Sequence, residues 1–554
     1  MIVGSLCAAL ALAASPVVAI LPGGMSLQGA LGMMPGDDEK PMGVTGSSKI
    51  KAYNMSVPID HFHNETKYEP HSNDSYNLRY WADTSHYKKG GPVIILHSGE
   101  FNSEGRLPFL EYGIASILTK ATGGVGIVLE HRYYGTSWPT KNASTESYRF
   151  LTTDQALADT AYFSKHLKIP GQEHLNLTSP ETPHILYGGS YAGGFVAIAR
   201  KVYPDVFWGA ISSSGVTVAI DDFWQYGEAT RHYAPGECSP TIQKLTDIID
   251  HALLNRDPEL SREIRTLFGL GSLMQDEFGS YLMGIQPSLQ GTNWDPEQDG
   301  IDFGAFCAII TSDSILFRST RHLLSRVRAV VEGAGYDGDS KRLTVRMLNY
   351  IGYVKQNVKG SRRNCKGEKK LRECLSARFE TGSIEINKDT WHRSWLYQTC
   401  TEWGYFMNGA GTPKDRLPMV SRAVTAEFSS YTCKSFFGIK TRPNVEIINK
   451  HGGFNFSYPR VALIDGKQDP WRSAGVHAMG LPDRLSTYEE PFELIDWGVH
   501  HWDENGISPF TAGNGELGLP PPEIWEIQQK EVKIVKHWLK EFKNKDRPGS
   551  GPEL

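Results

Sequence analysis

Residues 187–194 read YGGSYAGG, which places one serine among four glycines and an alanine. The apolar residues 184–186 come before this stretch and the helix-like run FVAIARKVY follows it, so the pattern predicts a strand that turns directly into a helix. Such a turn needs small neighbours and leaves the serine hydroxyl pointing outward, as in the pattern G-x-S-x-G. Here Gly188, Ser190 and Ala192 occupy the three defined places, with alanine at the last. The stretch predicts Ser190 as a nucleophile, and a plain glycine-rich turn is the alternative.

The segments around this turn alternate between strand and helix patterns. The runs PVIILHSGE (92–100) and VGIVLEHR (125–132) are rich in β-branched residues and indicate buried strands, whereas residues 153–167 have helical spacing. Strand-like runs return at 460–466 and 492–498, before a closing amphipathic helix. The alternation predicts a mainly parallel sheet covered by helices.

Between these two parts the pattern is helical and strand signals are scarce. Six cysteines lie between residues 238 and 433, without a paired C-x-x-C motif, so the sequence predicts three disulfides and no structural zinc. We therefore expect an α/β-hydrolase core, formed by residues 49–220 and 436–545, with a disulfide-bearing helical cap inserted at 221–435. Residues 546–554 are expected to form a flexible tail.

The N-terminal residues indicate a secreted chain. Residues 1–19 are small and apolar and end in Val-Val-Ala, which predicts a signal peptide, and residues 20–48 resemble a flexible leader or propeptide. A signal anchor is the alternative for the first segment. Secretion or delivery to a lysosomal or vacuolar lumen also suits six N-x-S/T sequons, whose asparagines are predicted glycosylation sites. These are Asn54, Asn64, Asn73, Asn142, Asn176 and Asn455.

Charge and composition exclude several classes of partner. The 554 residues carry a net charge of −5 and no basic block, so we expect no nucleic-acid partner. No later segment is long and apolar enough to predict a stable membrane span. The sequence leaves the oligomeric state open.

A nucleophilic serine needs a histidine to remove its proton and a carboxylate to orient that histidine. Both should follow Ser190 in the chain, on loops after the last strands. The run RVALIDGKQDPWRS offers Asp465 and Asp469, and Asp469 is preferred because it lies beyond the strand. The run FELIDWGVHHWDENG offers the remaining candidates, which are Asp496, His500, His501 and Asp503.

Several motifs resemble one peptidase family. They are YGGSYAGG, EHRYYG (130–135), FLTTDQALAD (150–159), VPIDHF (57–62), YQTCTEWGYF (397–406), DGKQDPW (465–471) and GVHHWD (498–503). Together they are similar to the family of lysosomal Pro-Xaa carboxypeptidase, dipeptidyl peptidase II and the fungal acid prolyl endopeptidases. The resemblance implies a triad of Ser190, Asp469 and His500, and a preference for bonds that follow proline, mostly in acidic surroundings. Val57 and the turn HSGEF (97–101) depart from the family pattern and leave the substrate preference open.

The expected reaction is acyl transfer from peptide substrates, with no metal or organic cofactor. The backbone N–H of Tyr191 is the predicted oxyanion donor, aided by a second donor from the 97–101 turn. Trp471 is a candidate wall for a proline ring, and packing within its loop is the alternative role. We expect Arg132 to be buried against carboxylates or carbonyls and His131 not to act as a second base. An esterase or lipase on the same fold, or a binding protein without activity, are the competing functions.

Overall fold

The computed structural model describes residues 50–298, 302–365, 370–376, 378–379, 383–387, 390–513 and 518–544. The predicted signal peptide, leader and C-terminal tail lie outside these residues. Among the described residues, no helix combines the length and the apolar character needed to cross a membrane.

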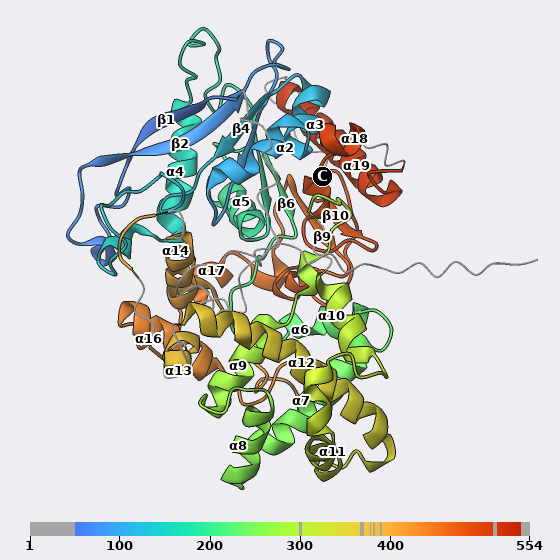
Figure 1. Cartoon of the computed structure of the whole chain (residues 1–554). Coiled ribbons are helices and arrows are strands. Elements are labelled where there is room, and N and C mark those ends of the chain that lie inside the picture. The colour runs from blue at the N-terminus through green and yellow to red at the C-terminus, as the bar shows by residue number, and fades with distance from the viewer. Residues whose placement is uncertain are drawn as a thin grey trace, which may run out of the picture.

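The core is an eight-stranded sheet in the order β1-β2-β4-β3-β5-β6-β9-β10 (Figure 1). The β1–β2 and β2–β4 pairs are antiparallel, and every later pair in this order is parallel. The strands are β1 (Ala52–Pro58), β2 (Ser75–Asp83), β3 (Val93–His97), β4 (Val125–Leu129), β5 (His184–Gly189), β6 (Gly209–Ser213), β9 (Val461–Gly466) and β10 (Phe492–Ile495). The carboxyl ends of the parallel strands therefore share one edge, where open α/β sheets bind their ligands.

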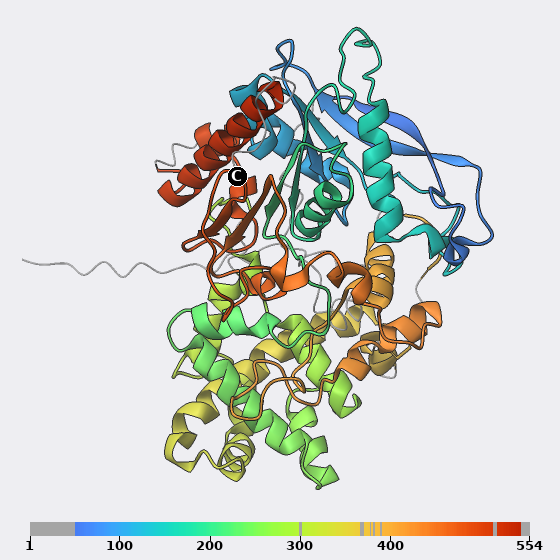
Figure 2. The same ribbon diagram turned by 180° about the vertical axis from the view of Figure 1, so that it is seen from behind.

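Successive residues of the central strands face opposite sides of the sheet, as strand geometry requires. Ile95 and Leu186 belong to the apolar cluster that includes residues of α4 (Thr153–His166) and α5 (Tyr191–Val202). Their neighbours Ile94 and Ile185 pack on the other face, in a cluster with α2 (Leu107–Glu111), α3 (Ile114–Thr122) and α19 (Pro522–Asn544). Figure 1 and its reverse view, Figure 2, show these two helical layers on either side of the sheet. The predicted α/β-hydrolase core is confirmed.

Helices of the insertion gather below the sheet in Figures 1 and 2. Helices α7 to α13 have an apolar core of their own. The helices that follow β6 and precede α19 are α6 (Tyr226–Tyr233), α7 (Cys238–Leu253), α8 (Pro258–Leu267), α9 (Gln275–Ile285), α10 (Asp302–Thr311), α11 (Leu324–Gly333), α12 (Ser340–Asn364), α13 (Leu371–Leu375), α14 (Trp391–Gln398), α15 (Ala426–Ser429), α16 (Tyr431–Phe437), α17 (Glu446–Asn449) and α18 (Pro509–Gly513). The helical cap is confirmed as a structural unit, whereas its boundaries at 221 and 435 stay a prediction. Not every helix between residues 221 and 435 packs in the core of the cap. Trp395 of α14 belongs instead to the apolar cluster that covers one face of the sheet.

The three predicted disulfides are confirmed, and all lie in the insertion. The pairs, which the sequence left open, are Cys238–Cys307, Cys365–Cys374 and Cys400–Cys433. The first joins α7 to α10, and the second ties the end of α12 to α13. Disulfides stabilise a fold mainly by restricting its unfolded chain, and the effect grows with the length of the closed loop, so the 69-residue separation of Cys238 and Cys307 should give the largest contribution of the three.

The structure also contains strands that the sequence patterns did not reveal. Residues of β1 and β2 pair antiparallel at the outer edge of the sheet. A second, two-stranded parallel sheet joins β7 (Ile220–Asp222) to β8 (Gly404–Phe406). It links the start of the insertion to the segment that follows α14.

Candidate active site

Ser190 occupies the single residue between β5 and α5. Its backbone has φ 59° and ψ −127°, a conformation that L-residues rarely adopt and that often marks a functional turn. Gly188 is required beside it, because a Cβ there would lie 2.3 Å from the carbonyl oxygen of Ala192. A Cβ at Gly193 would lie 2.8 Å from the Cα of Gly215, where α5 packs against the loop after β6. The small residues of YGGSYAGG thus permit the abrupt strand-to-helix turn expected from the sequence.

The three side chains predicted from the sequence form a continuous hydrogen-bonded chain. His500 Nε2 lies 2.8 Å from Ser190 Oγ, and His500 Nδ1 lies 2.8 Å from Asp469 Oδ2. With the Nδ1 proton donated to the carboxylate, Nε2 is left to accept the hydroxyl proton of the serine. Asp469 is completely buried, and His500 is nearly so. The structure therefore brings the three predicted triad residues into one hydrogen-bonded chain, and their roles in catalysis stay a prediction.

Local backbone contacts fix the orientation of the carboxylate. Asp469 follows β9 and precedes the short 3-10 turn Pro470–Ala474. Its second oxygen, Oδ1, accepts the backbone N–H of Trp471 at 2.8 Å, so only Oδ2 faces His500. The Asp-Pro-Trp sequence thus caps its own turn and aims one carboxylate oxygen at the imidazole.

The other carboxylates considered from the sequence have different partners. Asp465 lies inside β9 and accepts from His477 Nδ1 at 2.5 Å. Asp496 is exposed and pairs with Lys467 at 2.8 Å. Asp503 is buried and accepts hydrogen bonds from the hydroxyls of Tyr187 and Ser213. Burial raises the pKa of Asp503 despite these two bonds.

The adjacent histidines point to different surroundings. His501 Nδ1 lies 3.0 Å from Glu504 Oε2, and the His501 backbone N–H donates to Ser214 Oγ at 2.8 Å. His131, the other histidine weighed as a base, lies with its Nε2 3.1 Å from the hydroxyl of Tyr191. Burial lowers the pKa of His131 to about 4. Of these histidines, His500 is the one that contacts Ser190.

Arg132 is buried as expected. Its guanidinium forms an ion pair with Asp159, with Nε 2.5 Å from Oδ2, and donates to the carbonyl oxygens of Ile59 and Phe150. A fully buried charge is tolerated only with such partners. Arg132 therefore connects the turn after β4 to α4 and to the loop after β1.

The predicted oxyanion donors lie at the start of α5, beside Ser190. Tyr191 is the first residue of α5, and the first N–H groups of a helix have no partner within the helix. The 97–101 turn packs against the same helix end, since a Cβ at Gly99 would lie 3.2 Å from the Cβ of Ala192. The positive end of the helix dipole adds to the attraction for a developing negative charge.

Trp471 belongs to an aromatic group beside His500. Its ring lies 6.5 Å from the His500 ring, 5.0 Å from Tyr405, 5.5 Å from Tyr226 and 5.6 Å from Phe223. The side chain is buried, and its indole N–H is occupied by a hydrogen bond. Both proposed roles of Trp471, as a pocket wall and as a packing residue, fit this position, so its contact with substrate stays a prediction.

Sequence reasoning missed a segment of the cap that reaches the active-site loops. In this segment, residues 289–297 and here named the cap strap, Gln290 Oε1 accepts the indole N–H of Trp471 at 2.8 Å. Trp294 of the strap donates its indole N–H to the carbonyl of Trp502 at 2.8 Å, and the Trp502 indole donates back to a strap carbonyl at 2.8 Å. The strap therefore contacts the loop of Asp469 and the loop of His500, and no motif in its sequence signals this.

The predicted glycosylation sites lie mostly on the surface. Asn142 is the half-buried one, and its Oδ1 accepts hydrogen bonds from the backbone N–H of Ser144 and the hydroxyl of Ser147. The exposed asparagines are Asn54, Asn64, Asn73, Asn176 and Asn455. Glycosylation itself stays a prediction.

Comparison with known sequences agrees with this geometry. The sequence profile described as Serine carboxypeptidase S28 matches residues 57–509. The chain belongs to the serine carboxypeptidase S28 family. The S28 chain is therefore a serine-type peptidase, and the family resemblance seen in its motifs is confirmed.

Curated relatives of this S28 peptidase carry consistent names. It is 46% identical over 496 residues to a probable extracellular serine carboxypeptidase of Arthroderma benhamiae, covering 89% of this chain and 68% of the relative. It is 27% identical to the serine protease vicPb of Bipolaris victoriae, covering 87% and 91% of the two chains. It is also 27% identical to the thymus-specific serine protease of Mus musculus, covering 84% of each.

Solved structures give weaker matches to the S28 peptidase. A lipase in an open form is 12% identical, covers 88% of this chain and 99% of its own, and has a TM-score of 0.29. An esterase rPPE mutant is 10% identical, covers 95% and 99%, and has a TM-score of 0.30. The assignment of the fold rests on the strand order and the helical layers, and not on these scores.

Proposed function

We propose that this S28 peptidase cleaves peptide bonds on the carboxyl side of proline, with Ser190 as nucleophile, His500 as general base and acid, and Asp469 as its orienting carboxylate. The assignment of the triad rests on two contacts of 2.8 Å, one between Ser190 Oγ and His500 Nε2 and one between His500 Nδ1 and Asp469 Oδ2. They join residues that are 310 and 31 positions apart, at the active edge of the sheet.

In the proposed reaction Ser190 Oγ attacks the carbonyl carbon of the scissile bond while its proton passes to His500 Nε2. The resulting oxyanion is stabilised by the N–H of Tyr191 and a donor of the 97–101 turn. When the C–N bond breaks, His500 returns the proton to the leaving amine. Water then attacks the acyl-enzyme, again losing a proton to His500, and releases the carboxylic acid product.

The preference for proline is supported by the apolar, aromatic surroundings of His500. A proline ring is compact, and its nitrogen carries no N–H in a peptide, so its pocket needs ring faces more than a hydrogen-bond acceptor. Trp471 and its neighbours Phe223 and Tyr405 supply such faces next to the base. The motif resemblance given above points to the same substrates.

Secretion is supported by three separate features. The relative from Arthroderma benhamiae is named as extracellular. The six cysteines of the described chain form disulfides, which persist in oxidising compartments. Five of the six sequons are exposed, which is what glycosylation requires. We place the enzyme in the medium or in an acidic lumen.

The test is digestion of a mixed peptide library by the purified enzyme at several pH values, with mass-spectrometric identification of the cut sites. We expect proline to be enriched immediately before the cut, and no cuts with the Ser190→Ala variant. Cuts without enrichment of proline would refute the specificity while leaving a serine peptidase. Hydrolysis of simple esters without any peptide cleavage would instead favour the esterase alternative.

A further inference from the structure

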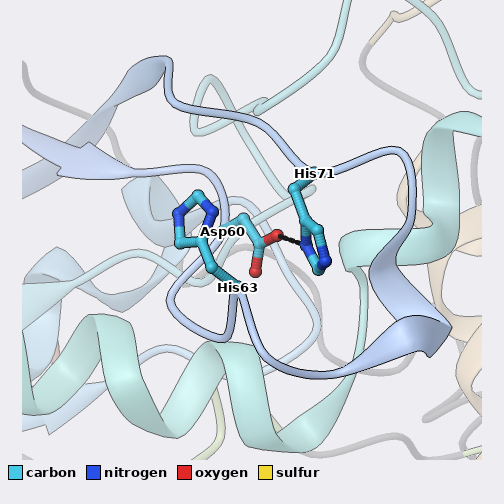
Figure 3. Close-up of side chains that lie close together, drawn as sticks. All are labelled: Asp60, His63 and His71. Carbon is cyan, nitrogen blue, oxygen red and sulfur yellow. Dashed lines mark hydrogen bonds and ion pairs between the residues drawn. The ribbon is translucent and has the colours of Figure 1, made fainter.

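A group of side chains that could bind a metal lies apart from the proposed active site, in the connection between β1 and β2. Asp60, His63 and His71 each offer one ligand atom, and these atoms lie within 4.8 Å of one another. Figure 3 shows the Asp60 carboxylate between the two imidazoles, with a dashed contact to His71. That contact joins His71 Nδ1 to Asp60 Oδ2 at 2.7 Å.

The carboxylate is held in place by contacts that leave one oxygen for the imidazoles. Asp60 Oδ1 accepts the side-chain N–H of Gln155 at 2.8 Å and the backbone N–H of Phe62 at 2.9 Å. Gln155 is itself buried in α4 and accepts the backbone N–H of His61 at 2.9 Å. Outer partners of this kind fix a carboxylate ligand, as they do in known metal sites.

The separations fit a metal after small movements of His71 and His63. Four-coordinate zinc with bonds of about 2.0 Å places its ligands roughly 3.3 Å apart. The distance between His71 and Asp60 must open slightly, as it does when a metal replaces the shared proton. His63 is exposed, so its ring can turn toward the carboxylate at little cost.

The donor set favours a transition metal over the alkaline-earth ions. Calcium and magnesium prefer oxygen ligands, whereas two imidazoles and one carboxylate suit zinc and its neighbours in the first transition series. Zinc commonly binds imidazole and carboxylate ligands in four-coordinate sites. Three protein ligands would leave a fourth position for water.

We propose that Asp60, His63 and His71 bind one divalent transition-metal ion, with Zn²⁺ as the natural occupant. The proposal adds a metal that the sequence analysis did not expect, because that expectation rested on the triad chemistry and on the cysteine spacing. Isolated histidines in a polar loop gave no recognised motif.

The position of the site assigns it a structural role. It follows β1, which is separated from β5 and Ser190 by three strands of the sheet, or roughly 19 Å at the usual strand spacing. The ion would close the 59–74 connection and tie it through Gln155 to α4. The same connection supplies His61, whose Nε2 lies 2.8 Å from Asp159, the partner of Arg132. Metal binding should therefore stabilise the sheet edge without taking part in peptide hydrolysis.

The test uses the untagged full-length enzyme, freed of metal with EDTA and then desalted. Calorimetric titration with ZnCl₂ should saturate at one equivalent, and Co²⁺ should give the visible absorption bands of a four-coordinate site. His63→Gln and His71→Gln should each weaken zinc binding on the order of 100-fold or more. The exposed His174 offers the matched control, and His174→Gln should bind zinc as the wild type does.

Two further measurements separate the site from loose surface binding. The melting temperature of the wild type should rise with zinc and fall with EDTA, while that of His63→Gln should respond to neither. Because His63 is exposed, this variant should fold normally. Failure of the wild type to bind zinc saturably, or unchanged affinity in His63→Gln, would overturn the proposal. So would an anomalous zinc peak elsewhere in a crystal of the loaded protein.

Discussion

Replacement of Glu402 by glutamine should change how the stability of this peptidase depends on pH. Glu402 is buried in the turn Thr399–Trp403, and its Oε2 accepts the backbone N–H of Thr153 at 2.9 Å and the Thr153 hydroxyl at 2.7 Å. Burial raises the pKa of this carboxyl from 4.5 to about 7, and the two hydrogen bonds only partly oppose the shift. The folded protein therefore keeps a proton that the unfolded chain has already lost at mildly acidic pH.

The sign and the size of the effect follow from this difference. Below pH 4.5 the carboxyl is neutral in both states, and its full contribution to stability is present. Between pH 4.5 and about 7 the unfolded chain has lost this proton while the fold still holds it, so stability falls by about 1.4 kcal/mol per pH unit, about 3 kcal/mol in all, and levels off above about pH 7. Glutamine keeps an acceptor for both donors of Thr153 but carries no charge at any pH.

The assay is urea unfolding of wild type and Glu402→Gln at pH 4.5 and pH 8, with the disulfides intact. The two proteins should match at pH 4.5, and the variant should be more stable by about 3 kcal/mol at pH 8. Glu526 is exposed on α19, so Glu526→Gln is the matched control and should change neither value. Burial also raises the pKa of Asp503 and of Glu531, so the variant should retain part of the slope. Equal pH dependence in Glu402→Gln and wild type would refute the reasoning.

The remaining predictions concern catalysis. Ser190→Ala should fold and be secreted normally but lose activity by a factor on the order of 10⁶, measured with a proline peptide, and residual activity near the wild-type level would remove Ser190 from the mechanism. His500→Ala should lose turnover to a similar extent, whereas His501→Ala should keep a measurable rate; the reverse result would move the base by one residue. Trp471→Ala should raise KM for proline peptides more than for a small activated ester, and an equal effect on both would assign Trp471 to packing alone. Gln290→Leu removes the acceptor of the Trp471 indole and should raise KM for the same peptides, so an unchanged KM would show that the cap strap does not position this ring.

Short sequence patterns predicted those features whose geometry depends on neighbouring residues in the chain. The turn at Ser190 could be predicted because a strand, a tight turn and a helix need small residues at fixed positions, and the structure places them there. The candidates Asp469 and His500 followed from the order of elements, since both come directly after late strands. The family motifs narrowed the choice between His500 and His501, which spacing alone left open.

Other features depend on contacts between distant parts of the chain. The strands β7 and β8 have three residues each, and they pair across more than 180 positions, so neither has a periodicity that could be recognised. Nothing in the sequence around Glu402 distinguishes it from an exposed glutamate. Its pKa is raised only because the folded chain buries it beside α4. Asp60, His63 and His71 likewise come close enough to form a candidate metal site only when the β1–β2 connection folds back on itself.

The cap strap contacts the loops of both Asp469 and His500, so it should affect substrate preference as well as catalysis. Asp469 and His500 stand on loops, and loops hold a geometry of 2.8 Å only where neighbours restrain them. The strap supplies such restraints to both loops, through Gln290 to Trp471 and through Trp294 to Trp502. The insertion therefore restrains the two loops that carry the proposed acid and base of the triad. A change in the strap would also move the ring beside His500, so specificity and turnover in this peptidase should vary together.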